Sequence, residues 1–214
     1  KDAQFGELFF EYEPFLGMRS YHPQPKIEAV QLQRAADLIN NAKKPLVLFG
    51  QGIILSKAED EFKAFIEKCD LPAAWTILGL SALETAHYLN VGMLGMHGNY
   101  APNKLTNECD VLIAVGMRFD DRVTGDLSRY AKQAKVVHIE IDAAEVNKNV
   151  FADVPVIGDA REILKQLLPL VKKQNHSDWR MEFAKLKQEE LALVINNELF
   201  PKEEELTMGE VIKC

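Results

Sequence analysis

The chain has 214 residues, 47% of them hydrophobic, which is enough for one domain with a sizeable core. Its formal net charge of -7 argues against a nucleic-acid-binding domain, because no basic stripe is present to meet phosphates. Cys69, Cys109 and Cys214 are odd in number and widely spaced, so neither a disulfide framework nor a metal site is predicted. No apolar run approaches the length of a membrane span. We therefore expect a soluble, cytoplasmic protein that binds neither nucleic acid nor membrane.

Along the chain, apolar runs alternate with amphipathic helical patterns. Residues 5–25 are rich in aromatic residues and proline and show no period, which predicts an extended linker. After this linker, apolar runs and helical periods mark the elements of one domain. The predicted strands are residues 45–49, 71–75, 111–115, 135–141 and 154–157. The predicted helices are residues 27–42, 57–68, 99–108, 127–134, 161–173 and 177–199.

Single residues add local detail to this pattern. Ser56 with Glu59 has the spacing of a capping box, which predicts the start of the second helix. Asn99 is the expected N-cap of the third helix, and Pro155 predicts that the last strand lies at a sheet edge. Residues 81–94 are expected to be irregular. The alternation of elements predicts an α/β fold, a doubly wound (Rossmann-like) parallel sheet of about five to six strands with helices on both faces.

Three turns that contain glycine or charged residues are candidates for ligand binding. Gly50-Gln51-Gly52 joins a strand to a helix, as in dinucleotide-binding folds, although Gly-x-Gly alone is a weak signal. The glycines of Leu94-Gly95-Met96-His97-Gly98 let backbone amides approach a ligand. Gly116-Met117-Arg118-Phe119-Asp120-Asp121-Arg122 follows a buried strand, at the place where open α/β sheets bind ligands. Its charges alone would also suit a solvated loop.

Glu140 ends the predicted strand 135–141. An acidic residue at such a strand end commonly accepts hydrogen bonds from ribose hydroxyls. The alternative is that Glu140 or Asp142 caps a following helix, and the presence of Glu145 three residues after Asp142 favours that role for Asp142.

Three motifs occur in the order LGMHG at residues 94–98, GMRFDDRVTG at 116–125 and VHIEID at 137–142. Together they resemble the central domain of the catalytic (large) subunit of the acetolactate synthase (acetohydroxyacid synthase) family. The resemblance covers nearly the whole chain, and the second motif is highly specific to that family.

The resemblance implies a division of the chain into three parts. Residues 1–25 would be the end of a preceding domain and a linker, residues 26–174 the central FAD-binding domain, and residues 175–214 an exit helix and the start of a third, thiamine-diphosphate-binding domain. The partners implied are the other domains of the same chain, a homodimer or homotetramer, and a possible regulatory small subunit.

The resemblance also implies the reaction of the full-length enzyme. That enzyme would condense pyruvate with pyruvate or 2-ketobutyrate, with loss of carbon dioxide, in branched-chain amino-acid biosynthesis. Thiamine diphosphate and Mg²⁺ would carry this chemistry on other domains. The family motifs that hold them are absent from this sequence, so we expect the chain alone to have no carboligase activity.

Within this chain the resemblance implies an FAD that does no redox work in the main turnover. Arg118 is the strongest candidate for phosphate contact, because a guanidinium offers bidentate hydrogen bonds. Asp121 and Arg122 would face the active-site entrance, and Arg19 is equally consistent with a surface arginine. The residues implied to contact FAD are Arg19, Gly50, Gln51, Gly52, Thr76, Ile77, Leu94, Gly95, Met96, His97, Gly116, Met117, Arg118, Phe119, Asp120, Glu140, Ile141, Asp159 and Ala160.

Three alternatives remain open at the level of sequence. A sister thiamine enzyme such as glyoxylate carboligase would share the fold and the FAD, but the motifs at 116–125 and 137–142 argue against it. A nicotinamide-binding domain would share the topology and differ in its cofactor. A structural spacer without a ligand is the non-enzyme alternative, and the departures from the family pattern at Gln51 and Glu140 leave it open.

Overall fold

The computed structural model describes residues 5–7, 9, 11–12, 24–200 and 207–213, so the candidate Arg19 lies outside the described residues. The strands are β1 (Pro45–Phe49), β2 (Ala73–Trp75), β3 (Asn90–Met93), β4 (Val111–Val115), β5 (Lys135–Glu140) and β6 (Val154–Ile157). The helices are α2 (Ala29–Asn41), α3 (Gln51–Leu55), α4 (Glu59–Cys69), the 3₁₀ helix η1 (Ile77–Ala82), α5 (Tyr100–Leu105), α6 (Asp121–Thr124), α7 (Ala160–Leu167), α8 (Ser177–Glu190), the π-helical turn η2 (Leu191–Ile195), α9 (Asn196–Leu199) and α10 (Met208–Lys213).

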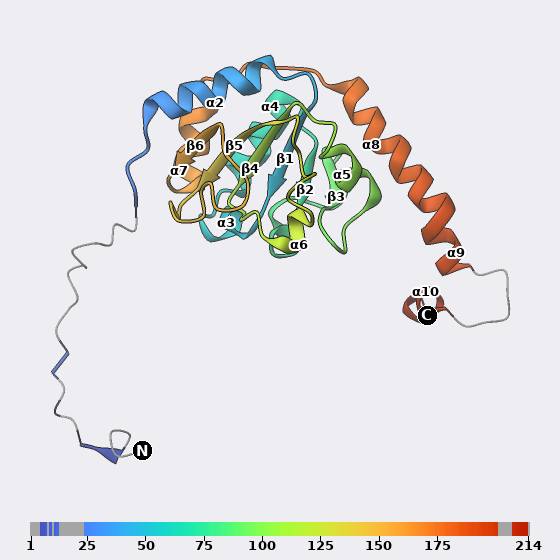
Figure 1. The fold of residues 1–214 in the computed structure, drawn as a ribbon, viewed down its shortest axis with the longest axis horizontal. Coiled ribbons are helices and arrows are strands. Elements are labelled where there is room, and N and C mark those ends of the chain that lie inside the picture. The colour runs from blue at the N-terminus through green and yellow to red at the C-terminus, as the bar shows by residue number, and fades with distance from the viewer. Residues whose placement is uncertain (1–4, 8, 10, 13–23, 201–206, 214) are drawn as a thin grey trace.

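The six strands form one parallel sheet in the order β3-β2-β1-β4-β5-β6 (Figure 1). This is the strand order typical of dinucleotide-binding domains. From β1 the chain adds β2 and β3 on one side, and it then crosses to the other side of β1, where it adds β4, β5 and β6, so the order reverses between β1 and β4. Those two central strands pair in register from Pro45 opposite Val111 to Phe49 opposite Val115. Both are buried along their whole length, as their unbroken apolar sequences predict. The prediction of a doubly wound parallel sheet is confirmed.

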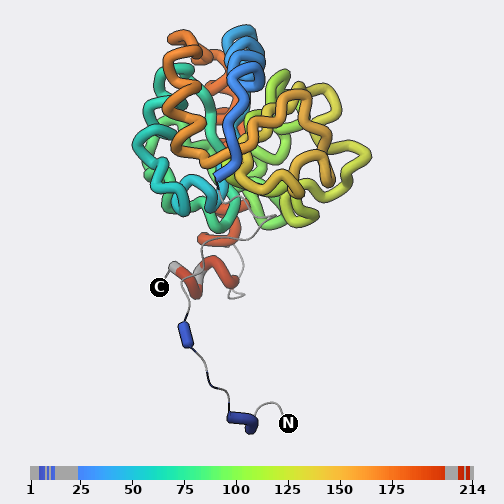
Figure 2. The backbone as a smooth tube through the Cα atoms, turned by 90° about the vertical axis from the view of Figure 1, so that its left-hand side faces the viewer, coloured from blue at the N-terminus to red at the C-terminus, as the bar shows by residue number. Residues whose placement is uncertain are grey.

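Helices cover both faces of the sheet and create two hydrophobic cores. The first core lies under α2, α3, α4 and α7 and contains the fully buried rings of Phe49, Phe62 and Phe65. Helix α2 runs beside α7 on this face (Figure 2). The second core lies under α5 and α8 and receives Trp179 and Phe183 from α8. Helix α8 then continues through η2 and α9 and leads away from the sheet (Figure 1).

Several local predictions are wrong, and side-chain hydrogen bonds account for most of the errors. Ser56 does not open a helix, because its hydroxyl donates to the carbonyl of Gly52 and so closes the short helix α3. Residues 127–134 form turns in place of the predicted helix. There Asp126 accepts from the backbone N–H of Ser128, and Ala131 has a φ of 46°. Asp142 accepts from Ala144 in a turn, and no helix follows β5 before β6.

Strand β3 was not predicted, because Asn and Gly are poor strand formers and residues 81–94 show no period. It forms an edge strand whose exposed backbone is covered by side chains. Gly92 N–H donates to Asn90 Oδ1, and Met93 N–H donates to Asn99 Oδ1. Asn99 stands at the N-cap position of α5, as predicted, but its side chain binds β3 and does not cap that helix.

The remaining predictions concern the position of the last strand in the sheet, the lengths of two helices, and membrane and metal binding. Strand β6 is at a sheet edge, as Pro155 predicted. Helices α5 and α7 end earlier than predicted, at Leu105 and Leu167. No helix among the described residues is long and apolar enough to cross a membrane. Within the same residues, no group of three or more His, Cys, Asp or Glu side chains could hold a metal ion.

Candidate functional site

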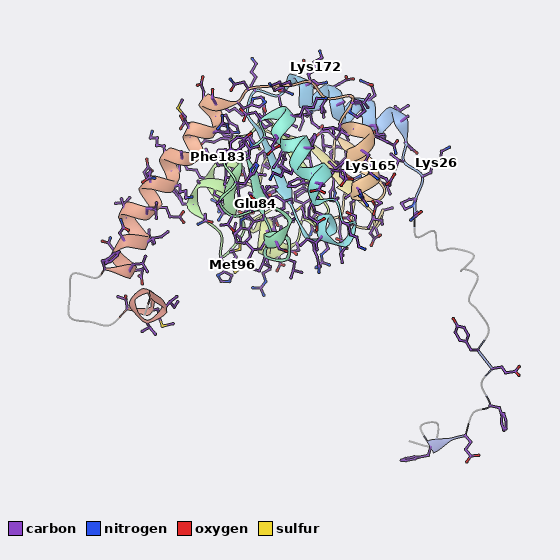
Figure 3. All side chains as sticks on the ribbon, turned by 180° about the vertical axis from the view of Figure 1, so that it is seen from behind. Lys26, Glu84, Met96, Lys165, Lys172 and Phe183 are labelled. Carbon is purple, nitrogen blue, oxygen red and sulfur yellow. The ribbon has the colours of Figure 1, made fainter. Side chains whose placement is uncertain are left out.

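A cavity of about 610 Å³ opens at the carboxyl ends of β1 to β5, around the point where the strand order reverses. This is where open α/β sheets bind their ligands. Met96, one of its lining residues, lies at the end of the domain opposite Lys172 (Figure 3). The cavity is lined by Gln51, Gly52, Leu55, Thr76, Ile77, Leu78, Met93, Leu94, Met96, His97, Gly116, Met117, Arg118, Asp120, Arg122, Val123, Glu140 and Ile141.

Backbone packing between glycines forms the floor of this cavity. Gly52 N–H donates to the carbonyl of Gly116 at 2.9 Å. A Cβ atom on Gly52 would lie 2.5 Å from Cα of Gly116, and a Cβ atom on Gly50 would lie 2.6 Å from the Gly116 carbonyl oxygen. Gly116 itself has a φ of 58°, a conformation that favours glycine. These glycines therefore allow the start of α3 to rest against the end of β4, which brings two of the predicted turns together.

The loop of residues 94–98 joins the same site from the β3 side. Gly95, at a φ of 105°, sits against the carbonyl of Arg122, where a Cβ atom would lie only 2.6 Å away. The next residue, Met96, donates its N–H to that carbonyl at 2.8 Å. The 94–98 loop and the segment 116–122 therefore contact each other directly, through residues that are 26 positions apart in sequence, Met96 and Arg122.

The charged segment after β4 divides its side chains between the cavity and the fold. Arg118 is 63% exposed and lies 3.8 Å from Asp120. Asp120 Oδ1 accepts from the backbone N–H groups of Arg122 and Val123, so this carboxylate is the N-cap of α6. Phe119 is buried in the second core, where its ring packs edge-on against His138.

His138 supports this segment from below and was not predicted as a site residue. Its ring is fully buried, and Nε2 lies 3.0 Å from the carbonyl oxygen of Met117. Burial lowers the pKa of His138, which favours the neutral ring with Nε2–H donating to that carbonyl. The available signal was a single histidine inside the apolar run 136–139, which is more often a core residue than a functional one.

Glu140 places a carboxylate in the cavity wall at the end of β5. The residue is 9% exposed, and Oε1 accepts from the backbone N–H of Ile141 at 2.9 Å. Burial raises the pKa of Glu140, and the nearby carboxylates of Asp142 and Glu145 raise it further. No donor among the described residues reaches Oε2, so this oxygen can accept a hydrogen bond from a ligand.

Most predicted site residues line the cavity, but six described ones do not: Gly50, Gly95, Phe119, Asp121, Asp159 and Ala160. Asp159 caps α7, because its carboxylate accepts from the N–H groups of Arg161 and Glu162. Ala160 is the first residue of that helix. The wall also contains four residues that the sequence did not single out: Leu55, Leu78, Met93 and Val123.

Large apolar side chains surround the mouth of the cavity. Ile77 is 67% exposed and Leu78 62% exposed on η1, and Met96 is 63% exposed on the 94–98 loop. Exposed apolar groups that gather at one place usually mark a binding surface. With Arg118 as a cation and Glu140 as an acceptor, the site offers an apolar surface, a phosphate-binding group and a hydroxyl acceptor, and Arg122 also lines the cavity.

Comparison with protein families gives a match that covers most of the domain. Residues 32–167 match the family described as the thiamine pyrophosphate enzyme, central domain. The matched region contains every strand of the sheet and all the described residues that line the cavity.

Similar curated proteins share one description. The chain is 43% identical over 171 residues to the probable acetolactate synthase large subunit of Methanocaldococcus jannaschii, covering 78% of this chain and 29% of that protein. It is 41% identical over 172 residues to the acetolactate synthase large subunit of Corynebacterium glutamicum, covering 80% and 28%. Against acetolactate synthase isozyme 3 large subunit of Escherichia coli it is 41% identical over 169 residues, covering 79% and 29%. The matching region spans less than a third of each relative, and these similarities confirm the resemblance that the three motifs predicted.

Proposed function

The chain belongs to the thiamine pyrophosphate enzyme central-domain family, and from that premise we propose that it is the FAD-binding central domain of an acetolactate synthase large subunit. One observation carries the cofactor proposal. A single cavity at the reversal point of the strand order combines an exposed arginine, a buried carboxylate acceptor and an apolar rim. These are the groups that a flavin dinucleotide requires for its pyrophosphate, its ribose and its ring system.

The described residues divide naturally among the parts of such a ligand. Arg118 would hold the pyrophosphate through charge-assisted hydrogen bonds. Glu140 would accept from ribose hydroxyls through its second oxygen. The apolar rim at Ile77, Leu78 and Met96 would cover the flavin ring. Asp121, which begins α6 outside the cavity wall, and Arg122 would face the active-site entrance of the full-length protein.

We propose the reaction of the full-length protein from its relatives' descriptions. It would condense two 2-keto acids, pyruvate with pyruvate or 2-ketobutyrate, with loss of carbon dioxide. Thiamine diphosphate would supply the carbanion chemistry when bound with Mg²⁺ on other domains. The role of the present residues would be to bind, orient and shield, and the isolated chain would form no acetolactate. The proposal includes a cytoplasmic homo-oligomer with a regulatory small subunit.

A nicotinamide dinucleotide is the second candidate ligand. The strand order and the acidic residue at the end of β5 are also features of NAD-binding domains. The rim of exposed apolar residues favours a flavin, because the larger flavin ring system would cover more of this surface.

Titration of the purified chain with FAD, followed by flavin fluorescence, tests the proposal, with NAD titrated in parallel. We expect saturable FAD binding that Arg118→Ala weakens by about ten- to a hundredfold, the effect of losing hydrogen bonds to a charged group. The matched control is Arg129→Ala, which removes an 84% exposed arginine paired with Asp126 outside the cavity wall. It should change the affinity less than about twofold. Saturable binding of NAD in place of FAD would favour the nicotinamide alternative, and binding of neither would favour the spacer.

A further inference from the structure

The 94–98 loop at the mouth of the cavity is held by one side chain of α5, that of Asn103, in addition to its backbone hydrogen bonds. Asn103 Nδ2 donates to the carbonyl of Gly95 at 2.9 Å, and Asn103 Oδ1 accepts from the N–H of Gly95 at 2.8 Å. Both polar groups of one side chain are therefore used on one loop residue. Since Met96 and His97 follow directly and line the cavity, the position of α5 sets the position of this part of the wall.

Helix α5 is in turn held by helix α8. The first N–H groups of a helix lack partners within the helix, and here Glu190 supplies one. Its Oε1 accepts from the N–H of Tyr100 at 3.0 Å, and its Oε2 accepts from Asn99 Nδ2 at 3.4 Å. Asn99 cannot cap α5 itself, because its Oδ1 is bound to the edge strand β3. A carboxylate ninety residues away in sequence thus acts as the cap.

Helix α8 is attached firmly at its start and weakly at its end. Near the start, Trp179 and Phe183 are buried in the second core, and Arg180 pairs with Asp70 at 2.9 Å. Near the end, a cavity of about 160 Å³ lies between the helix and the β3 edge, lined by Leu191 and Ile195 among others. No residue of η2 is buried. The hydrogen bonds of Glu190 are therefore the main polar attachment that the described residues give this end of α8.

Glu190 is also the residue at which the helix changes its geometry. Helix α8 ends at Glu190, and the π-helical turn η2 begins at Leu191. π-Helical turns are rare and occur frequently at functional sites. The cavity of about 160 Å³ is also lined by Trp75, whose indole Nε1 is buried without a hydrogen-bond partner among the described residues.

We propose that Glu190 is a positioning residue that couples the end of helix α8 to the mouth of the cavity. The connection runs from Glu190 to the N-terminus of α5, from Asn103 of α5 to Gly95, and from the 94–98 loop to the carbonyl of Arg122. Movement of α8 would change the cavity wall without touching the ligand. The inference rests on the proposed function only through its ligand-binding readout.

Amide hydrogen exchange of the isotope-labelled chain tests this coupling in the absence of any ligand. In Glu190→Ala we expect exchange at Tyr100, Gly95 and Met96 to accelerate by about tenfold, the effect of losing hydrogen bonds to a charged group. Amides of β1 and β4 exchange by global unfolding, so they report any general loss of stability, and the loop amides should accelerate by more than these reference amides do. Glu190→Gln keeps an acceptor for Tyr100 and should recover part of the protection.

Two further variants separate coupling from general damage. Glu182→Ala removes an exposed carboxylate of the same helix and should leave all these amides unchanged. Asn103→Ala removes the hydrogen bonds between α5 and Gly95 but leaves those between Glu190 and α5. It should therefore accelerate amide exchange at Gly95 and Met96 and leave Tyr100 protected. If Glu190→Ala accelerates Tyr100 alone while Asn103→Ala accelerates Gly95, the loop is independent of α8 and the proposal is wrong.

FAD titration of the same variants links the coupling to the proposed ligand. Glu190→Ala should weaken FAD several-fold, with Glu182→Ala as the unchanged control. A wild-type chain that binds no FAD would contradict the proposed function but not the coupling, which the exchange data decide alone. Accelerated loop exchange with unchanged FAD affinity would limit the coupling to the loop and overturn its extension to the ligand.

Discussion

The two ends of the parallel strands carry the same kinds of polar residue in different roles. The end where the strands begin is called the amino edge of the sheet, and the end where they finish is called the carboxyl edge. At the amino edge, Asp110 accepts from the N–H groups of Lys43 and Lys44 at 2.7 and 2.9 Å. Asp70 accepts from the N–H of His176 and pairs with Arg180. Each carboxylate is thus satisfied by the chain itself.

At the carboxyl edge, polar groups are left available. Arg118 is largely exposed with its carboxylate neighbour Asp120 3.8 Å away, and no donor among the described residues reaches Oε2 of Glu140. Polar groups that the chain itself satisfies are structural, whereas the exposed guanidinium of Arg118 and the unused Oε2 of Glu140 are available to a ligand. Variants at the amino edge should therefore change stability, and variants at the carboxyl edge should change binding.

The largest effect on stability is expected from Asp70→Ala at the amino edge. The change leaves Arg180 and the N–H of His176 without their acceptor in a mostly buried position. We expect the free energy of unfolding to fall by about 3 kcal/mol, measured by urea denaturation. The exposed Asp37→Ala serves as a control with a change below about 0.5 kcal/mol. A large loss of FAD affinity in the folded variant would contradict the division between the two edges.

Gly52→Ala should affect both properties, because the floor of the cavity is also a packing contact. The added methyl group would overlap the backbone of Gly116. We expect a loss of about 2 kcal/mol in the free energy of unfolding, with weaker FAD binding measured by fluorescence. The neighbouring Gln51→Ala truncates an exposed side chain and should cost less than about 0.5 kcal/mol. Unchanged stability of Gly52→Ala would show that α3 and the end of β4 separate easily.

Glu140→Gln should stabilise the ligand-free chain and weaken the binding of the ligand. The folded-state pKa of Glu140 is raised above 4.5, so its stabilising contribution exists below pH 4.5 and is lost as the pH rises through the folded-state value. At pH 7 the ionised side chain is therefore a cost that glutamine removes. We expect the Tm to rise by about 2–4 °C at pH 7, with no difference below pH 4.5. A lower Tm at pH 7 would mean that the carboxylate stabilises the fold.

The smallest effect expected is the pH dependence caused by buried His138. Its folded-state pKa is lowered below 6.5, so the unfolded chain binds a proton first and stability falls as the pH drops from 6.5 through the folded-state value. His138→Gln keeps a donor for Met117 and should reduce the slope of unfolding free energy against pH by up to about 1.4 kcal/mol per pH unit. His176, whose pKa burial also lowers, should leave a residual slope. An unchanged slope in the variant would show that His138 does not titrate differently on folding.

Much of the fold could be predicted because it depends on local composition. The runs at Pro45–Phe49 and Val111–Val115 are apolar without interruption, and this pattern alone specifies strands buried on both faces. Gly50 and Gly116 directly follow these two runs, so the glycine turns could be placed at the ends of the strands. Strand β3 was missed, since an edge strand of Asn, Val, Gly and Met gains its stability from partners distant in sequence.

The candidate site was predicted in outline and corrected in detail. Short contiguous motifs were enough to predict which loops lie at the carboxyl ends of the strands and which family the chain belongs to. Only the tertiary structure decided that Asp120 and Asp159 cap helices, that Gly52 packs on Gly116, and that Glu190 holds α5. The two caps are local, but each depends on where a helix begins, and the packing of the fold sets that point. The other two contacts join residues far apart in sequence, so they appear only when the folded backbone brings donor and acceptor within about 3 Å of each other.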